Sequence, residues 1–381
     1  MTNLDDVLAL DDGTEQEREP DDADLIRSPF DPDRIDVTTR NPTIDLLLSR
    51  IASGSIDLAP DFQRKGGIWT TQRQSRLIES LLLRIPLPTL YAAEDENEVW
   101  AVVDGVQRLT TITSFMAPKH IGAEPLVLSG LEYLRDQYEG KTYEELPGRL
   151  QLRLRETELV LHLIRNGTPE EVKFNIFARI NTGGMPLSAQ ELRHAMMPGQ
   201  ARDILQRMAA SRSFREATGD SVRSERMADR EMALRFAAFY LSDPSQYASQ
   251  DFDDFLRRAM RKINHLGVGE VNDLFAAFDR GTKAARSLLG DHAFRKFGSD
   301  GVRRMPINKA LFEAQAVTLA RAGAHSSPWY ASRSDKALYR VHALLSEPDF
   351  ERAVSQGTGD VAKVRLRFAE TRNVMKELGI V

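Results

Sequence analysis

The sequence predicts an α+β domain followed by an all-α helical domain. Between residues 36 and 197, helical patterns alternate with short runs rich in β-branched and aromatic residues, such as "TLYAAE" and "VWAVVDG". Beyond residue 198 the helical patterns continue and strand patterns nearly vanish. We therefore divide the chain into an acidic, disordered tail over residues 1–35, an α+β domain over residues 36–197 and a helical domain over residues 198–381.

The helices and strands expected in the first domain have recognisable starts and ends. "NPTIDLLLSRIASGSI" places Asn41 and Pro42 at the cap and first turn of a helix, and Gly54 ends it. Thr71 and Gln74 form a capping-box pattern that opens a second helix through "RQSRLIESLLLRI". The runs "TLYAAE" and "VWAVVDG" then flank the turn-forming "EDEN", which predicts a β-hairpin.

The composition is that of an ordinary globular protein. With 381 residues, 41% of them hydrophobic, the chain is long enough for two core-forming domains. No apolar run approaches the ~20 residues that span a bilayer, and the N-terminus lacks the pattern of a secretory signal, so we expect a cytoplasmic protein. The absence of cysteine excludes disulfides, thiolate nucleophiles and cysteine-ligated zinc, and the seven histidines include no His-x-x-x-His pair.

Charge is distributed unevenly along the chain. Residues 1–26 hold ten acids against one base, a balance of -9, so the formal net charge of -5 leaves +4 for the remainder. Such an acidic start without aromatic residues is typical of a disordered, solubilising tail, and a tail that competes with nucleic acid for a basic surface is the alternative. In the helical domain, basic edges such as "RRAMRK" at 257–262 are either solvated helix faces or contacts to DNA phosphate.

The stretch "VVDGVQRLTTI" joins the end of the second hairpin strand to a helix. The first amides of that helix and the positive end of its dipole make the turn an anion site. The Arg108 fork can bind phosphate, Gln107 can orient a water molecule, and Asp104 can hold a metal ion or polarise that water. A structural interpretation is also open, in which Asp104 is the N-cap, Gly105 relieves the turn and Arg108 is a solvated surface group.

Four blocks follow one another along the first domain: "PDFQRKGGIW", "SRLIESLLLRIPLPTLY", "VVDGVQRLTTI" and "FARINTGGMPLSAQELR". In order and spacing they resemble the N-terminal domain of GmrSD-type modification-dependent restriction systems, over residues 41–197 and, more weakly, at "INKALFEA" further along. The resemblance implies a ParB/sulfiredoxin-like fold, and nucleotide binding and hydrolysis with a divalent metal, Mg²⁺. Family members commonly have Gln where this chain has Val106, so one polar contact of the usual motif is missing.

The resemblance assigns a role to each matching residue. Asp104 would polarise water or hold the metal, Gln107 would position the water, and Arg108 would bind phosphate. The candidate nucleotide-binding residues are Gln63, Arg64, Gly105, Arg108, Asn181, Gly183 and Gly184.

Several of these residues also have a structural interpretation. Gln63 and Arg64 can cap or line their loop, and Gly183 and Gly184 suit the end of a helix. Glu79, in the second predicted helix, also has two interpretations. It can orient Arg64 or Arg108, or it can be a solvated helix acid.

Three functions fit these residues. The first is a nucleoside triphosphatase whose cycle controls restriction of foreign or modified DNA, as part of an anti-phage defence system. The second is a nucleotide-gated DNA-binding or adaptor module that recruits a separate nuclease without turnover. The third makes the Asp104 pocket itself a ParB-like nuclease. DNA is a partner that these functions would involve, and a separate nuclease or restriction subunit is one for the first two.

Overall fold

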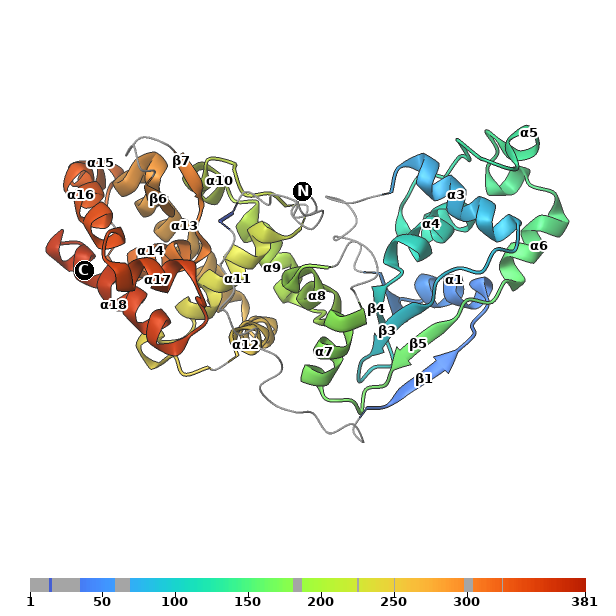
Figure 1. Ribbon diagram of the computed structural model, residues 1–381, viewed down its shortest axis with the longest axis horizontal. Helices are drawn as coiled ribbons and strands as arrows, with labels where there is room; N and C mark the ends of the chain where they lie inside the picture. The colour runs from blue at the N-terminus through green and yellow to red at the C-terminus, as the bar shows by residue number, and fades with distance from the viewer. Residues whose placement is uncertain are drawn as a thin grey trace, which may run out of the picture. The chain divides into compact units, whose positions relative to one another are not determined.

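The computed structural model describes residues 14–15, 35–58, 69–180, 187–224, 226–249, 251–297, 304–323 and 325–381 (Figure 1). The chain forms two compact units. The first consists of Ser28–Met196, and the second of Met197–Val381 together with Thr14 and Glu15. The acidic tail expected over residues 1–35 therefore lies outside the described residues, except for Thr14, Glu15 and Ile35.

A mixed five-stranded sheet forms the centre of the first unit. Its strands are β1 (Val37–Arg40), β2 (Ile56–Asp57), β3 (Leu90–Glu94), β4 (Trp100–Asp104) and β5 (Leu161–Ile164), in the order β1-β5-β3-β4-β2. β1 pairs antiparallel with β5, β5 parallel with β3, β3 antiparallel with β4, and β4 parallel with β2. The β3–β4 pair confirms the predicted hairpin, and the sheet with its helices confirms an α+β first domain.

Helices lie on both sides of this sheet (Figure 1). They are α1 (Ile44–Ala52), α3 (Thr71–Leu82), α4 (Val106–Met116), α5 (Arg135–Tyr138), α6 (Gly148–Glu156), α7 (Glu170–Ile180) and α8 (Ala189–Met196). Side chains of α1, α3 and α4 share one apolar core with sheet residues such as Leu90, Val102 and Leu163. α8 packs against β4 and contacts α7. Burial on both faces explains why the central strands are nearly continuous apolar runs.

Helix caps differ from the sequence prediction by one or two residues. Thr43, rather than Asn41, caps α1, and its side chain accepts a backbone hydrogen bond from the first turn. Thr70, rather than Thr71, caps α3 and accepts from the Arg73 amide. Neighbouring residues that can all act as caps cannot be distinguished by type, so the backbone path decides between them.

Helices make up most of the second unit. They are α9 (Gln200–Ala209), α10 (Arg212–Thr218), α11 (Ala228–Tyr240), α12 (Phe252–Asn264), α13 (Val268–Leu289), α14 (Lys309–Arg321), α15 (Ser327–Ala331), α16 (Ser334–Leu345), α17 (Pro348–Ser355) and α18 (Val361–Glu377). α14 is the central helix, buried from Ala310 to Ala320, with α11, α13, α17 and α18 packed around it. Gly281 permits the close approach of α13, because a Cβ there would lie 2.3 Å from the Ala316 carbonyl oxygen.

None of the helices in the described part of the chain has the length and hydrophobicity that crossing a membrane requires.

The second unit also contains two strands, so the expectation of an all-α domain is wrong in this respect. β6 (Arg295–Phe297) and β7 (Arg304–Ile307) pair antiparallel. Phe294 and Ile307 are fully buried next to this pairing. The strands are short and rich in basic residues, and that composition hides the alternation by which strands are recognised in a sequence.

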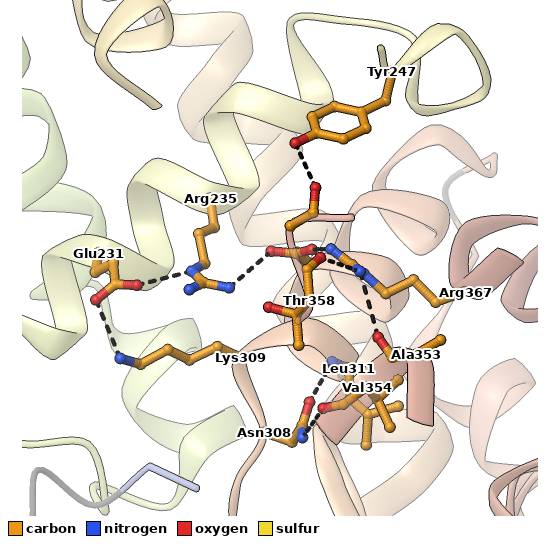
Figure 2. Close-up of polar contacts among 12 residues, drawn as sticks. Glu231, Arg235, Tyr247, Asn308, Lys309, Leu311, Ala353, Val354, Thr358 and Arg367 are labelled. Atoms are coloured by element: carbon orange, nitrogen blue, oxygen red, sulfur yellow. Dashed lines mark hydrogen bonds and ion pairs between the residues drawn. The ribbon is translucent and has the colours of Figure 1, made fainter. Parts of the chain in front are cut away.

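A buried network of charged side chains lies in the core of the second unit (Figure 2). Arg367 of α18 forms an ion pair with Glu313 of α14, and both side chains are 0% exposed. Arg235 lies 3.6 Å from Glu313 and 2.9 Å from Glu231. Lys309 Nζ lies 3.1 Å from Glu231. The charges alternate in sign along this chain of contacts, which offsets the desolvation of each group.

The basic segment 257–262 lies on α12 beside acids of the same helix. Arg257 is 4% exposed, contacts Asp253 and lies 3.6 Å from Asp254. Arg258 pairs with Asp254 at 3.1 Å. These acids neutralise part of the positive charge of the segment, which weakens the alternative of a contact to DNA phosphate there.

Candidate functional site

The candidate site lies where β4 ends and α4 begins. The register of β3 and β4 shifts, so that Tyr91 pairs with Asp104 whereas Ala92 pairs with Val102. β4 therefore contains one extra residue, Val103, at this point. Such bulges change the direction of a side chain near the end of a strand. Here the redirected residue is Asp104, the first residue of the Asp-Gly-x-Gln-Arg motif.

Gly105 makes the turn between the strand and the helix. Its φ of 94° lies in the left-handed region that favours glycine. A Cβ at this position would also lie 2.2 Å from Leu90 Cδ2 and 3.3 Å from Arg108 Nη2. Backbone conformation and packing together require glycine here, which is sufficient reason for its presence without a ligand.

Arg108 is buried, so the interpretation of this residue as a solvated surface group is wrong. Only 9% of the residue is exposed. Its Nη1 donates to the carbonyl oxygens of Pro88 and Thr89, and its Nη2 donates to Thr89 at 3.3 Å and to Asp104 Oδ2 at 3.1 Å. The guanidinium thus connects the loop before β3 to the end of β4 and holds the Asp104 carboxylate in place.

Asp104 is not the N-cap of α4, so the capping interpretation is also wrong. The cap position belongs to Gly105, and no side chain accepts a capping hydrogen bond there. The Asp104 carboxylate instead pairs with Arg108, and its side chain remains 43% exposed. The carboxylate therefore has one side fixed by the protein and one side open to a ligand.

Gln107 lies in the first turn of α4 and is partly exposed. Its backbone carbonyl accepts from the Thr111 hydroxyl, whereas its side-chain amide makes no hydrogen bond within the described part of the chain. The uncapped start of α4 also directs first-turn amides and the positive end of the helix dipole toward the same turn. Gln107 and these amides can therefore bind a ligand without breaking internal hydrogen bonds.

A row of polar and aromatic side chains adjoins Asp104 across the sheet. By strand register, Tyr91 is the partner of Asp104 on one side and of His162 on the other. The Tyr91 and His162 rings lie 5.2 Å apart, and His162 Nδ1 lies 2.9 Å from Thr39 Oγ1. The sequence motifs do not reveal this row, because its members come from four different strands. Tyr91 in "LYAAE" and His162 in "LHLI" do interrupt apolar runs, which is a signal for part of the row, whereas Thr39 lies on the largely exposed β1 and gives none.

Glu79 is 3% exposed and binds a loop, so the expectations of a solvated acid and of a partner for Arg108 are wrong. The expected contact with Arg64 lies outside the described residues. Its carboxylate accepts from the backbone amides of residues 132–134 at distances between 2.7 and 3.0 Å. Burial alone would raise the pKa of the Glu79 carboxyl, but these amides and the nearby Arg76 outweigh it and hold the pKa below its ordinary value. Glu79 is thus an ionised anchor for the loop that follows Leu128.

Five of the predicted nucleotide-binding residues lie outside the described residues: Gln63, Arg64, Asn181, Gly183 and Gly184. The first two follow Leu58, and the other three follow Ile180 at the end of α7. Because β2 and β4 are parallel neighbours, the carboxyl end of β2 lies at the same edge of the sheet as Asp104. The assignment of all five residues to nucleotide binding stays a prediction.

Asp104 is the described residue of the turn that can hold a metal ion. The described residues contain no group of three or more His, Asp or Glu side chains suited to a metal. Mg²⁺ does not need such a group, since one or two carboxylates with phosphate oxygens and water commonly hold it. The open side of Asp104 therefore fits a metal that arrives with a phosphate ligand.

The strand, turn and helix start define an α+β domain in which a half-exposed carboxylate lies beside uncapped helix amides that suit an anion. The family model described as GmrSD restriction endonuclease, N-terminal domain, matches residues 44–197. This part of the chain therefore belongs to the GmrSD N-terminal domain family. No curated protein and no solved structure shows a significant match to the chain.

Proposed function

We propose that this chain is a component of a DNA restriction or anti-phage defence system, and that its first unit binds and hydrolyses a nucleoside triphosphate at the turn after β4. Membership of residues 44–197 in the GmrSD N-terminal domain family supports the restriction role. The half-open Asp104 carboxylate beside the start of α4 supports the nucleotide role and is the observation that carries it. A ParB/sulfiredoxin-like fold for this unit is part of the same proposal.

The residues of the turn divide the work between them. The first amides of α4 attract the phosphates, whereas Arg108, the candidate phosphate ligand, has its guanidinium donors on Pro88, Thr89 and Asp104. Asp104 holds Mg²⁺ or polarises water, and Gln107, whose amide has no internal partner among the described residues, positions the water for attack. Bound Mg²⁺ would neutralise phosphate charge during the transfer. Arg108 keeps Asp104 oriented throughout, because its donors to Pro88 and Thr89 fix the guanidinium.

The adaptor alternative is favoured by one observation, at Val106. This residue is 7% exposed and belongs to the apolar core. Its side chain therefore supplies no polar group at a motif position that is commonly Gln in relatives. Without that polar contact, the unit would bind a nucleotide but not hydrolyse it, and the bound state would recruit a separate nuclease.

The deciding experiment measures binding, phosphate release and DNA cleavage together. The purified full chain is incubated with each nucleoside triphosphate and Mg²⁺, with and without DNA. Phosphate release that requires Mg²⁺ supports the proposal, saturable binding without release supports the adaptor, and DNA fragments produced by this chain alone support a nuclease. Absence of both binding and release for every nucleotide would contradict the proposed site.

A matched pair of variants tests whether the turn is responsible. Gln107→Ala removes the water-positioning amide and should reduce phosphate release at least about tenfold, because a positioned group of this kind contributes that much or more. Gln137→Ala changes an exposed glutamine of α5 and should leave release unchanged. Equal release by the two variants would place the activity elsewhere.

A further inference from the structure

The described part of the acidic N-terminal segment pairs with β7 in the second unit. Thr14 forms a parallel bridge with Ile307, and the Glu15 amide donates to the Ile307 carbonyl oxygen at 2.6 Å. Thr14 is 7% exposed. These two residues therefore continue the β6–β7 pair by a single bridge at the edge of β7, and backbone pairing at a sheet edge is a common way to bind extended segments.

Both carboxylate oxygens of Glu15 are bound by side chains of the second unit. Lys296 Nζ lies 2.6 Å from Glu15 Oε1, and Asn308 Nδ2 donates to Oε2 at 3.0 Å. Backbone pairing and a charge-assisted contact thus act on the same residue. This combination selects an extended segment with a carboxylate at one defined position, rather than acidic sequence in general.

The groups that bind Glu15 are themselves fixed by the fold. Asn308 is 3% exposed, donates to the Val354 carbonyl at 2.7 Å and accepts from the Leu311 amide as the cap of α14 (Figure 2). Lys296 is 17% exposed at its side chain and also lies 3.1 Å from Glu351. A site with donors that are held in place loses little entropy on binding.

We propose that the edge of β7 with Lys296 and Asn308 is a docking site for an acidic, extended segment, and that the N-terminal segment of this same chain is its occupant. Thr14 and Glu15, which the structure describes, already make the backbone and side-chain contacts of this site. Glu15 and Asn308 are 293 positions apart in the sequence, so this contact joins the N-terminal segment to a part of the second unit that is distant in sequence. Covalent attachment raises the local concentration of the segment, so a weak contact suffices.

Hydrogen exchange of the full chain tests the occupant. The Glu15 amide is bonded to Ile307 and should exchange slowly in the wild type, whereas Glu15→Gln should speed exchange of residues 14–15 about tenfold or more. Glu19→Gln removes an equal charge from the same acidic segment and should leave that exchange slow. Unchanged protection in Glu15→Gln, or equal loss in both variants, would overturn the proposal.

A labelled peptide tests the site itself. The peptide has the sequence of residues 11–18, "DDGTEQER", and its binding to full-length proteins is followed by fluorescence anisotropy. It should bind Glu15→Gln, whose own segment has left the site, at least about tenfold more tightly than the wild type. Adding Lys296→Met to Glu15→Gln should abolish that binding. Equal binding by the wild type and Glu15→Gln, or none by either, would contradict a docking site.

Discussion

Two arginine–carboxylate pairs in this chain differ in what surrounds them. In the first unit, Arg108 pairs with Asp104 at 3.1 Å, and the Asp104 side chain is 43% exposed. In the second unit, Arg367 pairs with Glu313, and neither side chain has any exposure. Both arginines are buried, so burial of a charge does not by itself identify a site. Of these two carboxylates, only that of Asp104 is exposed and can meet a ligand without rearrangement of the core.

The elements that each pair joins explain why the two carboxylates differ in exposure. The Arg108 pair lies at a junction between a strand and a helix, where a glycine turn brings backbone carbonyls and a carboxylate to one guanidinium. The Arg367 pair joins α18 to the central helix α14, and Arg235 extends it toward Glu231. The first arrangement orients a group at an edge, whereas the second joins helices inside a core.

Breaking the fully buried pair of Arg367 and Glu313 should lower the free energy of unfolding the most. Arg367→Met leaves Glu313 buried and without its main counter-charge, so the free energy of unfolding of the second unit should fall by about 4 kcal/mol. Urea unfolding gives the loss, and hydrogen exchange of α14 assigns it to this unit. The double variant Glu313→Leu with Arg367→Met should be more stable than the single variant, because no unpaired charge remains. A single variant as stable as the wild type would show that the pair is not desolvated.

Breaking the partly exposed pair of Arg108 and Asp104 should lower the free energy of unfolding by less. Arg108→Met removes the donors to Pro88, Thr89 and Asp104, but water can reach the exposed carboxylate, so the loss should be about 2 kcal/mol. Arg108→Lys keeps the charge without the planar fork and should recover only part of it. Hydrogen exchange of α4 reports the change locally. If Arg108→Met lost as much as Arg367→Met, the distinction between the two pairs would not hold.

Local patterns predicted the framework of the candidate site well. The hairpin, the turn at Gly105 and the helix after it all appear where the residues indicate them, because strand composition and a glycine turn act over a few neighbouring positions. The type of turn was less accessible. Asp-Gly fits both an aspartate cap and a glycine turn, and the left-handed backbone of Gly105 selects the second.

Contacts distant in the sequence account for what could not be predicted. Glu79 meets backbone amides more than 50 positions away, and Glu15 meets Lys296 at a separation of 281. Neither partner carries a motif, because a backbone amide has the same chemistry in any residue and a single lysine has no distinguishing neighbours. The bulge that redirects Asp104 likewise depends on pairing with β3 and leaves no mark in the β4 sequence.

The smallest effect on stability should come from Asp104→Asn, which makes it the sharpest test of the open carboxylate. Asparagine keeps an oxygen that can accept from Arg108, so the melting temperature should stay within about 3 °C of the wild type. The lost charge removes the group that holds Mg²⁺ or polarises water, so phosphate release should fall at least tenfold, or about 1.4 kcal/mol of transition-state stabilisation.

Asp95→Asn is the matched control for that substitution. Asp95 lies in the β3–β4 turn of the same unit, and its Oδ1 accepts from the amides of Asn97 and Val99, a role that asparagine can keep. This variant should match the wild type in both melting temperature and phosphate release. If Asp104→Asn also released phosphate at the wild-type rate while binding nucleotide, its carboxylate would serve only to pair with Arg108. The turn would then resemble the enclosed pair of the second unit in function as well as in chemistry.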